Sequence, residues 1–393
     1  MNMQGVYRTI ITGAAAVTAF AATLSAQIVV VGTGDPDIDI AAVQSAADRG
    51  GSILLRGHFS FDTPPTKHGA LAGLMATVII SKQVTISGTW DEHGDLTAIQ
   101  GGEIPFAVEA PGAEVRIERL HFVHPKRYAI FVDEVSGLAI ESCAIESVEP
   151  LPPPDNPTGI RYGFGIYVST LLGLPTPERP GNLANVSGKL SILKNEISIA
   201  EAADEGMGIM MVSVGGAEKP VDIDISGNSI RNANQKGINM KQIGGRARIE
   251  HNIVTTSSIY SGRSGALIAG IHCGGTGTYL IAHNRVDIAD PNGAGIRLRA
   301  YPGLNALIES ATVVNNDVTI SAAENADFGA ASAGIEIRGF ARNNVVKGNR
   351  IRGRARVAMS LATDSTGIPS ANTFEENDHK LFISSPADGG RKK

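Results

Sequence analysis

Residues 270–299, GIHCGGTGTYLIAHNRVDIADPNGAGIRLR, hold one full period of the pattern that decides the fold. The stretch runs from one Gly-Ile-x-aliphatic unit, GIHC (270–273), to the next, GIRL (295–298), and an asparagine with aliphatic residues on both sides lies between them. Short alternating runs bounded by Gly and Asn predict β-strands separated by turns. Because successive residues of a strand face opposite sides, Ile296 and Leu298 are predicted to point inward, and Arg297 and Arg299 outward.

Both halves of this pattern recur along the chain. The Gly-Ile unit returns as GIYV (165–168), GIMM (208–211), GINM (237–240) and GIEI (334–337), with weaker copies AIFV (129–132) and RVAM (356–359). The asparagine unit places its asparagine at positions 195, 228, 252, 284, 316 and 349, with Asn377 as a last copy, at spacings of 33, 24, 32, 32, 33 and 28 residues. Repeats of this length predict a solenoid of stacked parallel coils.

The asparagines are predicted to form a column from coil to coil. Asn tolerates the left-handed backbone conformation of a sharp bend. Coils are stacked about 4.8 Å apart, so equivalent side-chain amides can hydrogen-bond along the column. The alternative is a set of plain turn asparagines without a ladder. Hydrophobic residues flank every copy and favour the ladder.

With this repeat, the chain resembles the right-handed parallel β-helix repeat proteins of the pectate-lyase-like (pectin lyase-like) superfamily, from about residue 28 to residue 383. The resemblance implies an all-β, single-stranded right-handed parallel β-helix of about ten or more coils. DIDIAAVQSAADRGGSILLRGHFSF, which begins at Asp37, is also typical of the superfamily and predicts a capping helix over 39–49 with Asp39 as its N-cap. Such a helix would cover the open edge of the first coil. We expect the β-helix domain over 27–383 and a disordered polar tail over 384–393.

The first 26 residues read as an export signal. Arg8 precedes the uncharged run IITGAAAVTAFAATLSA, and cleavage could follow Ala21 or Ala26. An uncleaved membrane anchor is the alternative, although the apolar run is short for a bilayer span. The expected location is therefore secreted, periplasmic or at the cell surface, with no stable membrane insertion after cleavage.

Composition narrows the function classes. A formal net charge of −5 does not suggest a nucleic-acid binder, and 46 glycines with 5% aromatic residues suit a thin layered β core.

Cys143 and Cys273 fall several coils apart, so both are predicted to be buried free thiols. His251 and His283 precede the ladder asparagines of adjacent coils and are expected to stack. Two imidazoles alone do not predict a metal site, so we predict none.

The outward strand positions define a candidate site. The first outward position of each Gly-Ile unit is predicted to form the column Phe131, Tyr167, Met210, Asn239, His272, Arg297, Glu336 and Ala358. The second is predicted to form the column Asp133, Ser169, Val212, Lys241, Gly274, Arg299, Arg338 and Ser360. This basic strip could bind an acidic polysaccharide, because arginine forks match carboxylates. It could equally be a solvated face.

Within the resembled superfamily, polyuronate lyases, epimerases and glycoside hydrolases use the groove along this strand stack. A lyase reading assigns Arg297 and Arg299 to carboxylate neutralisation, Lys241 or His272 to the base, and Tyr167 or a loop tyrosine to the acid. Substrate-binding candidates are Asn239, Glu336, Arg338, Arg161, Tyr301 and Arg263.

Three other readings carry less weight or stay open. Hydrolysis needs two carboxylates a fixed distance apart, and only Glu336 is central on the strip, so a hydrolase or epimerase is less favoured. No cofactor is predicted; calcium is possible but no acid cluster indicates it. The competing class is a non-catalytic carbohydrate-binding or structural β-helix protein at the cell surface or in the periplasm. In both cases we expect a monomer.

Overall fold

The structure is a computed structural model of the 393-residue chain. It describes residues 27–62, 76–90, 96–152, 159–169, 186–201, 203–215, 220–257, 268–300, 308–321, 332–339, 341–362 and 372–381. The predicted export signal, 1–26, and the predicted tail, 384–393, lie outside the described residues. No helix within the described residues is long and apolar enough to cross a membrane.

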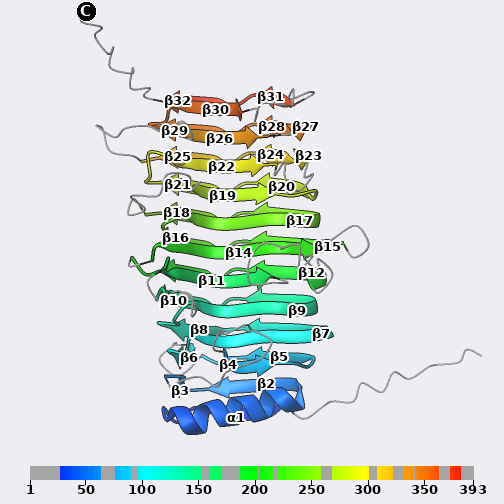
Figure 1. The fold of residues 1–393 in the computed structure, drawn as a ribbon, viewed down its shortest axis with the longest axis vertical. Helices are drawn as coiled ribbons and strands as arrows, with labels where there is room; N and C mark the ends of the chain where they lie inside the picture. The colour runs from blue at the N-terminus through cyan, green and yellow to red at the C-terminus, as the bar shows by residue number, and fades with distance from the viewer. Residues whose placement is uncertain are drawn as a thin grey trace, which may run out of the picture.

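The chain folds into a right-handed parallel β-helix, with its strands stacked along one long axis (Figure 1). Each coil contributes strands to three faces. A 19-stranded sheet bends to form the first and second faces, and an 11-stranded sheet forms the third. Eleven stacked strands on the third face confirm the prediction of ten or more coils.

The first face holds β4 (Ala76–Ile80), β11 (Tyr162–Ser169), β14 (Glu205–Gly215), β19 (Ala269–Gly274), β22 (Ala294–Arg299), β26 (Ala333–Arg338) and β30 (Val357–Ala362). Three long strands bend from the first face into the second: β7 (Ile104–Glu118), β9 (Tyr128–Glu141) and β17 (Lys236–Glu250).

The second face adds β1 (Ile28–Val31), β2 (Gly51–Arg56), β5 (Val84–Ser87), β12 (Val186–Leu193), β15 (Val221–Ser226), β20 (Thr278–Ala282), β24 (Thr312–Val314), β28 (Val345–Lys347) and β31 (Thr373–Glu375). The third face holds β3 (His58–Ser60), β6 (Thr97–Gln100), β8 (Leu120–Val123), β10 (Ala144–Val148), β13 (Glu196–Ile199), β16 (Ser229–Ala233), β18 (Ile253–Thr256), β21 (Arg285–Ile288), β25 (Asp317–Ile320), β29 (Arg350–Gly353) and β32 (Asp378–Leu381). A two-stranded sheet pairs β23 (Ile308–Glu309) with β27 (Ala341–Arg342).

The interior is a stack of aliphatic side chains from the Gly-Ile units. The isoleucines of these units pair in register from coil to coil, and each is fully buried: Ile166, Ile209, Ile238, Ile271, Ile296 and Ile335. Burial of one such side chain contributes about 1.5–3 kcal/mol. The repeat therefore supplies the core directly, as the sequence predicts.

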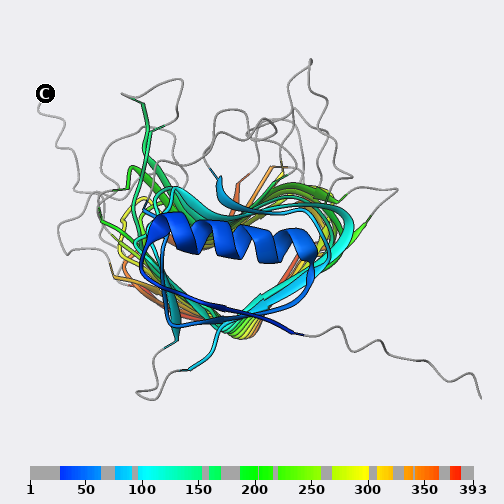
Figure 2. The same cartoon turned by 90° about the horizontal axis from the view of Figure 1, so that it is seen from below.

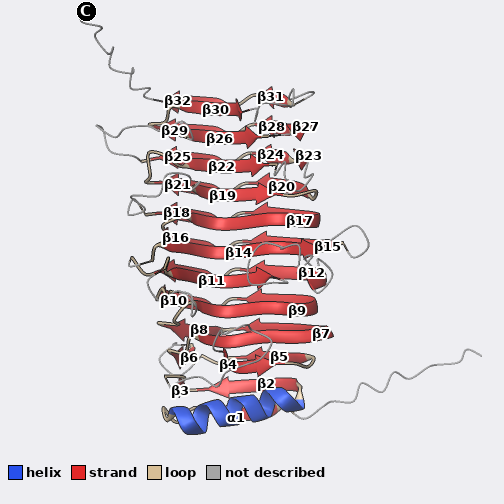
Figure 3. Ribbon diagram, in the orientation of Figure 1, coloured by secondary structure: helices blue, strands red, loops and turns tan. Residues whose placement is uncertain are grey.

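One helix, α1 (Pro36–Arg49), lies across the open first end of the solenoid (Figures 2 and 3). It begins three residues earlier than predicted, because Asp35 is the N-cap and accepts a hydrogen bond from the Asp37 backbone N–H. The prediction of Asp39 as N-cap is therefore wrong. The buried Asp39 carboxylate instead accepts hydrogen bonds from the backbone N–H groups of Thr33, Gly34 and Ser60, and so ties the helix to the strands beside it.

The predicted asparagine ladder is confirmed. Each ladder side-chain amide donates to the Oδ1 of the asparagine in the next coil, at 2.9–3.0 Å, from Asn195 to Asn377. The Cys143 backbone N–H donates to Asn195 Oδ1 at 2.9 Å, which places Cys143 at the predicted ladder position. The sequence pattern did not reveal a second, shorter ladder, in which Asn344 donates to Asn372.

The left-handed residue of each bend is the one before the ladder asparagine, not the asparagine itself. His251 and His283, for example, each have φ of +56°. The ladder asparagines are thus needed for their amides, because each amide satisfies buried backbone groups of the preceding coil: Asn284, for example, accepts from the Asn252 N–H and donates to the Ile249 carbonyl. Cys143 and Cys273 are buried and free, as predicted.

Candidate functional site

The outer side of the first face carries three columns of residues, here called columns one, two and three. Column one is the residue directly before each Gly-Ile unit: Tyr128, Phe164, Met207, Lys236, Ala269, Ala294, Ala333 and Val357. Columns two and three are the two predicted outward columns. Their predicted register is confirmed from Phe131 to Glu336 and from Ser169 to Arg338.

The prediction for the last coil is wrong by two residues. Glu336 pairs with Ser360 rather than Ala358, and Arg338 with Ala362 rather than Ser360. Val357 and Met359 both fit the inward pattern, and a shift of two residues preserves the alternation of faces. The sequence therefore offered two equivalent registers at this coil.

The strip formed by the three columns changes character halfway along the helix. Its first half is an apolar cluster in which Tyr128 stacks on Phe164 at 5.2 Å between ring centroids, with Phe131, Tyr167 and Met207 packed around them. The second half is polar and cationic. We call this second half the basic cluster and define it by Lys236, Asn239, Lys241, His272, Arg297, Arg299, Glu336 and Arg338.

Arg297 lies at the predicted outward position of its strand, but its side chain is completely buried, which contradicts the alternative of a solvated face at this residue. Its Nε forms an ion pair with Glu336, whose side chain is 3% exposed, and its Nη1 donates to the Ile268 carbonyl at 2.9 Å. A buried guanidinium requires such partners, because leaving water is costly for a charge. Arg297 and Glu336 are thus part of the packed body of the strip.

His272 is held in one tautomer by its neighbour. Its Nδ1 lies 2.7 Å from Asn239 Oδ1, and Asn239 Nδ2 donates to Met207 Sδ at 3.3 Å. Because sulfur accepts here, the amide orientation is set, so His272 Nδ1–H donates to Oδ1 and Nε2 is the basic nitrogen. Burial lowers the pKa of His272 well below its usual value, and the cations around it, first Lys236, lower it further.

Lys236 is the residue of the cluster that the sequence reading missed. Among the described residues, no carboxylate lies within 4.0 Å of its buried Nζ, which donates to Gln235 Oε1 at 3.1 Å. The pKa of Lys236 is lowered to about 7, mainly by burial. Nearby cations such as Arg297 also lower it, and the negative charge of Glu205 acts in the opposite direction. A lysine in column one, where the following coils have alanine, was the available signal.

Column three provides the half-buried edge of the cluster. Lys241, Arg299 and Arg338 each retain some exposure there, and Gly274 separates Lys241 from Arg299 in the column. Gly274 has no side chain and is itself buried, and the two cations are two coils apart in the column. Burial, and then the charge of Arg299, lower the pKa of Lys241. The coil order therefore places three cations in one column.

Other predicted site residues do not join the cluster. Tyr167 lies four strand spacings from Arg297 in the register, about 19 Å, and packs among the aromatic rings of the first half. Arg161 is half exposed and forms an ion pair with Asp204 at 3.1 Å. Tyr301 and Arg263 lie outside the described residues.

Carboxylates occur on the strip mainly at its opposite end. Asp133 begins column three, and burial together with Glu134 and Glu109 raises its pKa to about 7. Within the described part of the chain, no group of three or more His, Cys, Asp or Glu side chains is arranged to hold a metal ion. Asp133 precedes Lys241 by three strand spacings, about 14 Å, so it does not balance the charge of the basic cluster.

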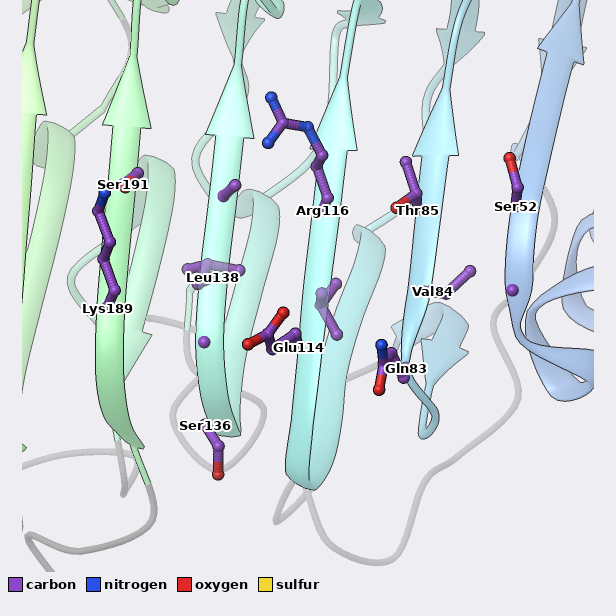
Figure 4. A pocket seen from close by; sticks show the side chains of 14 residues that line it. Ser52, Gln83, Val84, Thr85, Glu114, Arg116, Ser136, Leu138, Lys189 and Ser191 are labelled. Atoms are coloured by element: carbon purple, nitrogen blue, oxygen red, sulfur yellow. The ribbon is translucent and has the colours of Figure 1, made fainter. Parts of the chain in front are cut away.

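The second face carries two shallow depressions, of about 550 and 600 Å³, that share Lys189. Figure 4 shows the first, where Arg116, Glu114 and Lys189 rise over a floor of small residues that includes Ser191. Arg116 is neutralised by Glu118 and Glu141, both at 2.6 Å. Such balanced charges do not select an ionic ligand, so the basic cluster is the stronger candidate site.

No family model and no curated protein matches the sequence. The solved structures that the chain is similar to include the Dettilon tailspike protein, with a TM-score of 0.36 and 12% identity, over 88% of this chain and 68% of that one. Tailspike protein 3 of bacteriophage CBA120 gives 0.36 and 11%, over 90% and 58%. The A-module of an Azotobacter vinelandii mannuronan C-5 epimerase gives 0.24 and 11%, over 90% and 98%. At these scores, function has to be argued from this chain's own residues.

Proposed function

We propose that this protein is exported and acts on an acidic polysaccharide, whose carboxylates bind to Lys241, Arg299 and Arg338 in column three. The observation that carries the proposal is the local excess of positive charge in a chain of net charge −5. The described cluster holds five cationic side chains, those of Lys236, Lys241, Arg297, Arg299 and Arg338, and one carboxylate, that of Glu336.

A linear polyanion suits this arrangement for two reasons. The three accessible cations follow one another along the helix axis, so one chain laid along column three can contact all of them. Arginine forks bind carboxylates through two parallel hydrogen bonds, which gives Arg299 and Arg338 a preference for uronate groups over neutral sugars.

The reaction we propose is a lyase reaction. Neutralisation of the uronate carboxylate by Arg299 acidifies the hydrogen on the adjacent ring carbon. A neutral amine or imidazole takes that proton, the electron pair forms a carbon–carbon double bond, and the glycosidic C–O bond breaks as its oxygen takes up a proton. Lys236 fits the base better than Lys241 or His272, because its pKa of about 7 combines a neutral form with useful basicity.

The other roles in this reaction follow from the positions of the side chains. Lys241, two coils from Arg299 in column three, replaces the more distant Tyr167 as the proposed acid. The buried Arg297 and Glu336 hold the strip in shape as positioning residues.

The test is a lyase assay with polygalacturonate, alginate and glycosaminoglycans, with and without calcium, that follows the ultraviolet absorbance of the unsaturated product. Arg299→Ala is expected to weaken polymer binding about tenfold to hundredfold, because a charge-assisted pair is lost, and to abolish the product signal. Arg285→Ala, on the exposed third face, is the matched control and should behave like the parent protein.

Binding measurements on the same polymers separate the alternatives. Binding that depends on Arg299 without any product would support the non-catalytic carbohydrate-binding reading. Neither binding nor product on any polymer would overturn the proposal.

Polymer binding is also expected to be linked to pH through Lys236. In the free protein its amine is protonated below pH 7 and neutral between pH 7 and its ordinary value of 10.5. Bound carboxylates favour the ammonium form and raise this pKa, so the complex takes up protons in that window. Affinity should therefore fall as the pH rises above 7.

Calorimetry at pH 8 in buffers of different ionisation enthalpy measures this proton uptake. Lys236→Met should remove the uptake while binding persists. An uptake that is unchanged in Lys236→Met would assign the proton to another group.

A further inference from the structure

His251 and His283 lie on the edge between the second and third faces, away from the basic cluster. They sit at the ends of β17 and β20, each directly before a ladder asparagine. Both side chains are exposed, their rings are parallel within 7°, and the ring centroids lie 5.1 Å apart. The predicted stacking of this pair is confirmed.

The backbone presents the two rings in the same way. Both residues have φ of +56°, and each backbone N–H donates at 3.2 Å to a carbonyl of the next coil: His251 to Ala282 and His283 to Val314. The asparagines that follow, Asn252 and Asn284, are joined by the ladder at 3.0 Å. Two adjacent coils therefore hold the two imidazoles side by side from equivalent backbone positions.

We propose that His251 and His283 form a two-histidine site for a borderline divalent transition-metal ion such as Cu²⁺, Ni²⁺ or Zn²⁺. Imidazole nitrogens suit these ions, which they bind at about 2.0–2.1 Å, and water completes the coordination. The torsion that turns an imidazole about its Cβ–Cγ bond is broad. Because parallel ring planes have no point in common, both rings must rotate about this bond, out of the stacked arrangement, before a nitrogen of each can reach a common ion.

The surroundings leave this edge open to an ion. The position below His251 in the same column is Gly227, which has no side chain, and the position above His283 is Asn315, which is uncharged. Glu250, next to His251, forms an ion pair with Arg248 at 3.0 Å. The two histidines are thus the proposed ligands of the ion. The bound ion would cross-link two adjacent coils and would take no part in chemistry at the basic cluster.

The experiment is a calorimetric titration of the purified chain, without an affinity tag that contains histidine, with chloride salts of Cu²⁺, Ni²⁺ and Zn²⁺. One ion per chain is expected at this site, with Cu²⁺ bound most tightly in the order Cu²⁺ over Ni²⁺ and Zn²⁺.

The variants are His251→Asn and His283→Asn, since Asn tolerates the left-handed backbone that both positions require. Each single variant should bind the ion at least about tenfold more weakly, and the double variant should lose the site. His121→Asn is the matched control, because His121 is a partly exposed histidine that lies 3.0 Å from Glu146 on another edge.

A second readout does not depend on heats of binding. An ion that binds only the folded chain raises the thermal unfolding midpoint, and this rise should be present in the parent protein and the His121 control and absent in the double variant. The proposal is overturned if no ion binds, or if the double variant keeps the same stoichiometry and the same rise.

Discussion

Arg297→Met is expected to lower the free energy of unfolding by about 3–5 kcal/mol. The substitution keeps an unbranched side chain but removes the ion pair with Glu336 and the hydrogen bond to the Ile268 carbonyl. Glu336 is then left as a buried carboxylate without its cation. Urea unfolding monitored by circular dichroism measures the change.

Two further variants show where this loss comes from. Arg297→Met combined with Glu336→Leu should recover most of the stability, because removing both buried charges can be close to neutral. Arg299→Met, on the half-buried edge of the same strand, should cost less than about 1 kcal/mol. A loss below about 1 kcal/mol for Arg297→Met itself would show that Arg297 faces water and belongs to an open groove.

Asn284→Ala is expected to cost about 3–5 kcal/mol, since it removes four hydrogen bonds from a buried position. Asn284 Oδ1 accepts from the backbone and the side chain of Asn252, and its amide donates to the Ile249 carbonyl and to Asn316. The same urea titration measures the loss.

Asn377→Ala is the control at the end of the ladder. Asn377 makes three of the equivalent bonds and is partly exposed, so water can replace its amide and the cost should be about 1–2 kcal/mol. Equal effects at the two positions would contradict a continuous buried ladder, and would instead indicate independent turn asparagines.

The sequence could predict the order of the residues along the candidate site, but not how deeply their side chains are buried. The order of Asn239, His272, Arg297 and Glu336 in one column follows from alternation within strands and repetition between coils. Their burial does not, because the exposure of an outward residue depends on what packs over the strip. Tyr167 differs, because the same column already places it four coils from Arg297, and its distance could have been counted from the sequence.

The sequence by itself determined the stack of coils, the inward isoleucines, the asparagine ladder and the two free cysteines. The first three are local patterns repeated in register, and repetition turns a weak local preference into a unique arrangement. The free cysteines follow from the number of coils between them. The tertiary structure alone decided the buried pair of Arg297 with Glu336 and the low pKa of Lys236. Both depend on burial and on charged residues that come from several coils, between Glu205 and Arg299. No single segment of the chain holds all of these residues.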